Sequence, residues 1–78
     1  MNEINIDIVL VIKRTSGPKF QYFTPESTWS DNPSNAWLYG TRLAFDHAAK
    51  IKDFKASVFL RLPKGREIHV DPSDFWID

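Results

Sequence analysis

The chain has 78 residues, and its ten Lys and Arg side chains balance ten Asp and Glu side chains, so the formal net charge is zero. That length predicts one domain over residues 1–78, near the lower size limit for a chain that folds alone. Zero net charge excludes a chain-wide field that would attract nucleic acid or an anionic membrane, and the absence of cysteine excludes disulfides and thiolate metal sites.

The N-terminal third of the chain predicts a β-hairpin. Residues 4–12 alternate in the period of two that is typical of a strand, and residues 19–24 form a second apolar segment after the turn signal Gly17-Pro18. Acidic residues precede the first segment, which argues against a secretory signal, and the segment is too short to cross a bilayer. We therefore expect a cytoplasmic protein without a membrane partner.

The stretch between the two hairpins, residues 29–52, has two interpretations. Residues 33–52 could form a single helix that tolerates Gly40 at a cost of about 1 kcal/mol. The alternative, which we favour, is a helical turn over residues 32–36, a short extended segment over residues 37–39 and a helix with Thr41 as its N-cap. In that helix the spacing places Phe45, Ala48 and Ala49 against the sheet.

The C-terminal third predicts a second hairpin. Residues 56–62 alternate as a strand, Leu62-Pro63-Lys64-Gly65 matches a type I turn, and residues 67–70 return as another strand. The apolar tail over residues 75–77 is expected to pack back onto the domain.

These elements predict an α+β fold of ββ(β)αββ order, an antiparallel sheet with one helix packed on one face. The opposite face then has no cover, and exposed apolar area of this kind marks an interface with a partner protein or with a second copy. The side chains expected on it are Val9, Val11, Phe59, Arg61 and His69. Trp29, in the polar loop, either fastens that loop to the sheet or projects as an interface anchor.

No catalytic constellation is recognisable. The serines lack a nucleophile elbow, and the glycines do not form a phosphate-binding loop. His69 and Asp71 together would supply two ligands, too few for a metal site, and the remaining acidic pairs are typical of turns and caps. The sequence therefore predicts a protein that is not an enzyme and has no metal or cofactor.

A nucleic-acid-binding protein is the alternative from another functional class. Basic residues of the two hairpins would have to join into one patch for this role, and acidic neighbours dilute that patch. The candidates are Lys13, Arg14, Arg61, Lys64 and Arg66.

A motif in the middle of the chain resembles small phage, prophage and other mobile-element proteins, in which a strand pair leads into a W-[ST]-D-[DN]-P turn and a capped helix. The resemblance covers residues 20–62, and Leu43 and Ala44 stand where acidic helix residues are usual. The matching residues are Trp29, Ser30, Asp31, Asn32, Pro33, Ala36, Tyr39, Thr41, Phe45 and Ala48. The resemblance implies a phage-encoded protein that binds a host protein stoichiometrically, as anti-CRISPR inhibitors do.

Overall fold

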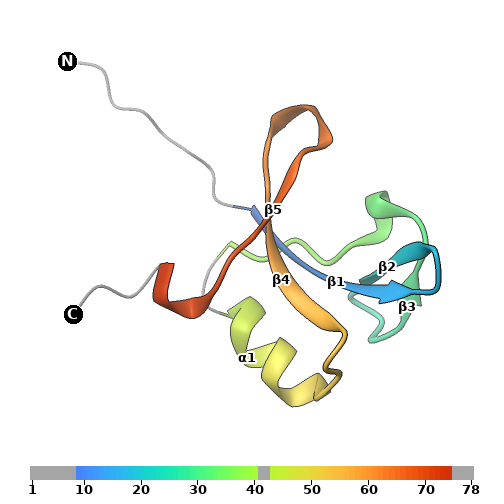
Figure 1. The fold of residues 1–78 in the computed structure, drawn as a ribbon, viewed down its shortest axis with the longest axis horizontal. Coiled ribbons are helices and arrows are strands. Elements are labelled where there is room, and N and C mark those ends of the chain that lie inside the picture. Colours follow the sequence, from blue (N-terminus) through green and yellow to red (C-terminus); the bar gives the residue numbers. More distant parts are fainter. Residues whose placement is uncertain (1–8, 41–42, 75–78) are drawn as a thin grey trace.

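The computed structural model describes residues 9–40 and 43–74 and has the predicted α+β architecture. Five antiparallel strands form one sheet in the order β3-β2-β1-β4-β5, and helix α1 (Leu43–Ile51) follows the third strand in the chain. Figure 1 shows α1 beside β4, with the β4–β5 hairpin extending to the top of the view and the β1–β2 hairpin to the right.

Strand β1 (Val9–Ser16) lies at the centre of the sheet and has partners on both edges. It pairs with β4 (Ala56–Arg61) from Val9↔Arg61 to Arg14↔Ala56, and with β2 (Lys19–Phe23) from Lys13↔Tyr22 to Ser16↔Lys19. The β1–β2 turn and the β4–β5 turn therefore lie at opposite ends of β1.

The two edge strands are short. β3 (Trp29–Ser30) pairs with β2, and β5 (Glu67–His69) pairs with β4. The sequence did not predict β3, because two polar-flanked residues have no measurable periodicity. The hydrogen bonds between Thr24 and Thr28 hold the preceding loop closed, and this places Trp29 opposite Phe23.

The break in the middle segment is confirmed. A 3₁₀ turn, η1 (Pro33–Asn35), begins with the Asn32 side chain accepting the Ser34 N–H at 2.9 Å. Before α1 begins, Tyr39 pairs with Leu10 of β1 through two backbone hydrogen bonds, with N to O distances of 2.7 and 2.8 Å. Thr41, the predicted N-cap, lies outside the described residues, as do residues 4–8 of the predicted first strand and the tail over residues 75–77.

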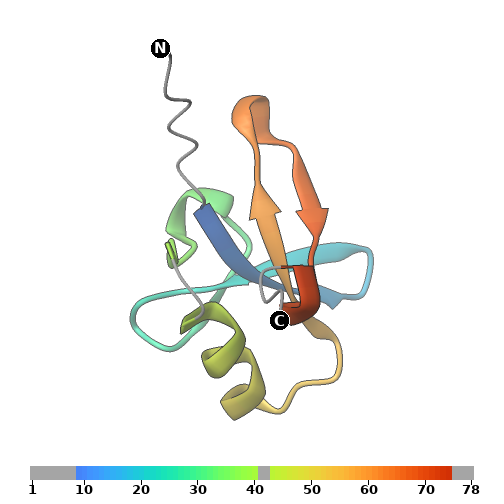
Figure 2. The ribbon, with the colours of Figure 1, turned by 90° about the vertical axis from the view of Figure 1, so that its left-hand side faces the viewer.

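Helix α1 covers one face of the sheet (Figure 2). Beneath it lies the main hydrophobic cluster, whose buried members are Leu10, Ile12, Tyr39, Ala44, Val58 and Val70. Phe45 and Ala48 pack against this cluster as predicted. Ala49 does not, because it is exposed, whereas Ala44 is fully buried.

The buried Ala44 and the exposed Ala49 provide a direct test of how closely the helix approaches the sheet. Ala44→Leu is expected to lower the unfolding free energy by about 1 to 3 kcal/mol, because the larger side chain has no space between α1 and the sheet. Ala49→Leu is the matched control and should leave the stability unchanged. Urea denaturation of both variants measures the difference, and equal stability would contradict the close contact at Ala44.

The β4–β5 turn differs from the predicted type I turn. Lys64 has φ of 67°, where the third position of a type I turn requires about −90°, and Gly65 follows with φ of 78°. Positive φ values at successive residues match the right-handed twist of a two-stranded hairpin. Glycine adopts positive φ at no steric cost, so Gly65 is unsurprising in this turn. For Lys64, by contrast, the sequence contains no signal that predicts a positive φ.

Candidate protein interface

The strand register brings together the residues predicted to share the face opposite α1. Val9 is the partner of Arg61, and Val11 is the partner of Phe59. Phe59 is in turn the partner of His69 on β5. Partners in an antiparallel pair point to the same side of the sheet, so the prediction of a common face is confirmed.

This face is not open, however, and the expectation that Val11 is exposed there is wrong. Val11 has no exposed surface, because Tyr22 from β2, Ala36 from the segment after η1 and the half-buried Phe59 enclose it. Val9, Phe59 and Arg61 are half-buried, so His69 is the one exposed residue among the five predicted for this face. The segment that follows η1 thus covers part of the face opposite α1.

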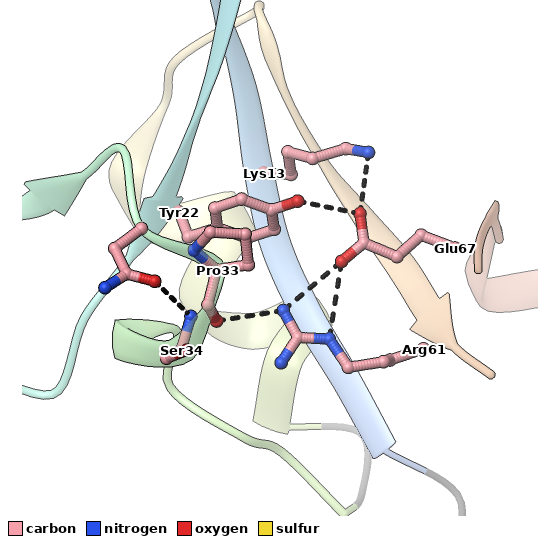
Figure 3. A network of polar contacts seen from close by, with 7 residues as sticks. Lys13, Tyr22, Pro33, Ser34, Arg61 and Glu67 are labelled. Carbon is pink, nitrogen blue, oxygen red and sulfur yellow. Dashed lines mark hydrogen bonds and ion pairs between the residues drawn. The ribbon is translucent and has the colours of Figure 1, made fainter. Parts of the chain in front are cut away.

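A polar network closes the same face around the carboxylate of Glu67, whose side chain is 9% exposed. One carboxylate oxygen accepts hydrogen bonds from Lys13 Nζ at 2.8 Å and Tyr22 Oη at 3.0 Å. The other accepts from Arg61, which also donates to the Pro33 carbonyl at 3.1 Å (Figure 3). Glu67 thereby connects its own strand, β5, to β1, β2 and β4, and Arg61 connects them to η1.

The environment of this network shifts two pKa values. Burial raises the pKa of Glu67, but hydrogen bonds from Lys13, Tyr22 and Arg61 and the charge of Lys13 outweigh burial, so the pKa lies below its ordinary value. The pKa of Tyr22 is raised by burial and by its hydrogen bond to the Glu67 carboxylate. Both shifts keep Glu67 ionised and the phenol protonated at neutral pH.

The predicted basic patch is dispersed rather than continuous. Lys13 and Arg61 both pair with Glu67, and Arg14 lies on the helix-bearing face, where it pairs with Asp53 at 3.1 Å. Lys64 and Arg66 are exposed at the β4–β5 turn, at the far end of the sheet from the β1–β2 turn. The five residues therefore do not form one surface.

Trp29 fastens its loop to the sheet. Its ring contacts Phe23 edge-on at 5.3 Å between centroids, and the Arg14 guanidinium lies over it at 4.1 Å. The half-buried indole packs against the main hydrophobic cluster. Of its two predicted roles, the structure places Trp29 in the structural one.

A different surface, which the sequence did not indicate, lies where the β1–β2 turn meets the loop between α1 and β4. Two neighbouring hollows of about 410 and 150 Å³ share Arg14, Thr15 and Lys55 in their linings. Two large aromatic side chains are exposed here, Phe20 at 49% and Phe54 at 92%. We call this the hairpin-end surface and define it by Arg14, Thr15, Lys19, Phe20, Phe54 and Lys55.

Asp53 holds Phe54 in its exposed position. The Asp53 carboxylate accepts the backbone N–H of Lys55 at 2.9 Å and the Arg14 guanidinium at 3.1 Å, and its carbonyl accepts the N–H of Ala56 at 2.9 Å. The Lys55 N–H and then Arg14 lower the pKa of this carboxyl group. Phe54 therefore projects from a turn that is fixed on both sides.

Within residues 9–40 and 43–74, His, Asp and Glu side chains do not form any group of three or more that could hold a metal ion. Asp74 instead accepts the backbone N–H of Asp71 at 2.8 Å, as expected for a turn-forming acid. The helix that the structure describes is neither long nor apolar enough to span a membrane.

No family model, curated protein or solved structure matches the chain.

Proposed function

We propose that the chain is a non-enzymatic protein-binding module that docks through the hairpin-end surface. The observation behind the proposal is Phe54, an aromatic side chain that is 92% exposed on a turn held by Asp53. Because the backbone of this turn is already held and a phenylalanine side chain has only two rotatable bonds, Phe54 loses little conformational entropy when it enters a partner's pocket. Aromatic anchors of this kind supply a large share of the binding energy in protein interfaces.

The charges beside Phe54 favour an acidic partner. Lys19 and Lys55 make no ion pair with any residue that the structure describes, whereas Lys13, Arg14 and Arg61 do. A partner with acidic residues around an apolar pocket would complement both features. Charges at the edge of such an interface mainly increase the rate of association.

The same charges argue against a homodimer through this surface. A twofold interface pairs each surface patch with its own copy, so Lys19 and Lys55 would face the lysines of the second molecule. We therefore propose a heterologous partner. The resemblance to mobile-element proteins supports a host protein in the bacterial cytoplasm, bound by an inhibitor of the anti-CRISPR type.

The proposal is tested by comparing two exposed apolar positions. Phe54→Ser is expected to weaken partner binding by at least about 2 kcal/mol, or roughly 30-fold, without changing the melting temperature. Leu38→Ser is the matched control, because Leu38 is 57% exposed and lies outside the hairpin-end surface. The measurement is retention of bacterial lysate proteins on each immobilised variant, followed by titration with the protein retained by wild type. Equal retention by Phe54→Ser and wild type would refute docking through Phe54.

A specific observation supports nucleic acid as a second candidate ligand. The exposed rings of Phe20 and Phe54 lie on the same surface as Lys19 and Lys55, which pair with none of the described residues, so two rings adjoin two cations. Surfaces that bind single strands combine stacking rings with cations in this way. Titration with a 15-residue oligo(dT) separates the candidates. Binding that falls steeply with salt and disappears in Phe54→Ser would replace the protein-binding proposal.

A further inference from the structure

A second candidate site, distinct from the hairpin-end surface, lies between α1 and the loop that follows β2. It is a groove of about 270 Å³, close to the lower end of the range for small-molecule sites. Its lining comes from four parts of the chain and consists of Phe23, Ser27, Trp37, His47, Lys50 and Ile51.

The aromatic wall of the groove is built from rings that hold one another in place. Trp37 is stacked between Phe23, at 6.3 Å between centroids, and Tyr39, at 4.9 Å. His47 meets Trp37 edge-on at 4.8 Å. Since the faces of the Trp37 ring are already stacked on its neighbours, the wall offers a planar ligand ring edges for edge-to-face contacts without rearrangement.

The hydrogen bond between Tyr39 and His47 fixes the position of the imidazole ring in the lining of the groove. Tyr39 Oη lies 2.8 Å from His47 Nδ1, and burial raises the Tyr39 pKa to about 12, so the phenol keeps its proton at neutral pH. Because the Trp37 ring also contacts the imidazole edge-on, His47 is held on two sides.

The polar groups of the groove complement an anion. Lys50 supplies a positive charge and Ser27 a hydroxyl group, and the lining contains no acidic residue. The groove is near the C-terminal end of α1, where the helix dipole contributes about half a negative charge. Lys50 and the adjoining Lys52 each contribute a full positive charge and outweigh it.

We propose that this groove binds a small aromatic carboxylic acid, with the planar ring against Trp37 and the carboxylate at Lys50. The ring area gives most of the affinity, and the exposed Lys50 adds a smaller, salt-sensitive part. This site is independent of the protein-binding function proposed above.

The test uses indole-3-acetate as the probe and neutral indole as its uncharged counterpart. In ¹H–¹⁵N spectra of the full chain, indole-3-acetate is expected to shift the Trp37 indole N–H and the amide resonances around His47, with a Kd below about 1 mM. Indole should bind about two- to five-fold more weakly.

Two lysine variants locate the carboxylate. Lys50→Gln should weaken indole-3-acetate binding about two- to five-fold and leave indole binding unchanged, whereas Lys52→Gln, just outside the groove, should alter neither by as much. Absence of shifts up to about 10 mM, shifts spread over the whole chain, or equal binding of indole and indole-3-acetate would each overturn the proposal.

Discussion

Val11→Asp is expected to unfold the domain at neutral pH. Val11 has no exposed surface and lies within the cluster formed with Tyr22 and Ala36, so an aspartate there would bury a carboxylate without a partner. The expected loss is more than about 4 kcal/mol, a large part of the roughly 5 to 15 kcal/mol that stabilises a small domain. Circular dichroism and urea denaturation followed by tryptophan fluorescence measure the loss.

Val9→Asp is the matched control for this experiment. Val9 lies on the same strand and face, but it is half-buried and stands opposite Arg61, which can pair with the new carboxylate. Its expected cost is about 1 kcal/mol or less. If Val11→Asp were as stable as Val9→Asp, the second face of the sheet would be open, and docking through it would again be the better hypothesis.

Glu67→Leu is expected to lower the unfolding free energy by about 3 to 5 kcal/mol, because it leaves two charged donors and the Tyr22 hydroxyl without their acceptor. The Lys13 side chain is only 11% exposed and has little access to water. The double variant Lys13→Met/Glu67→Leu should recover part of the loss, since it removes the buried charge as well. Chemical denaturation gives the coupling energy, and Glu26→Leu, at an exposed position, is the control.

The pH dependence of stability tests the same network through its charge state. Because the folded-state pKa of Glu67 is below the ordinary value of 4.5, its contribution is fully present above that value and is lost as the pH falls through the folded-state pKa. Glu67→Gln should therefore flatten the fall in unfolding free energy between about pH 5 and 3. Asp53 titrates in the same range, so both proteins are compared in an Asp53→Asn background. Parallel curves would contradict the lowered pKa of Glu67.

The features that the sequence predicted correctly depend on short-range periodicity and turn chemistry. Alternation over β1 and β4 is strong enough to assign the face on which each side chain lies, whereas the strand order did not follow from it. Gly40 followed by the expected N-cap Thr41 favoured a break in the helix, and this local signal correctly separated η1 from α1.

The features that it missed depend on contacts between distant residues. Lys13 and Glu67 are 54 positions apart, and nothing near either residue indicates the other. The segment from η1 to Ala36 folds across the sheet, and this places Ala36 over Val11. The apolar face opposite α1, which the sequence predicted to be exposed, is therefore covered at Val11. Phe54 is the opposite example. A phenylalanine is expected in the hydrophobic core, but the turn held by the Asp53 carboxylate leaves this side chain exposed.

The position of β1 at the centre of the sheet has a consequence for how the protein is made. The β1–β2 hairpin is local and can form early, but Leu10 and Ile12 become shielded only when β4, more than 40 residues later in the chain, has been synthesised. Folding must therefore await a long-range pairing, which is slow relative to hairpin closure. A nascent chain ending before residue 56 would expose these side chains to chaperones and to aggregation.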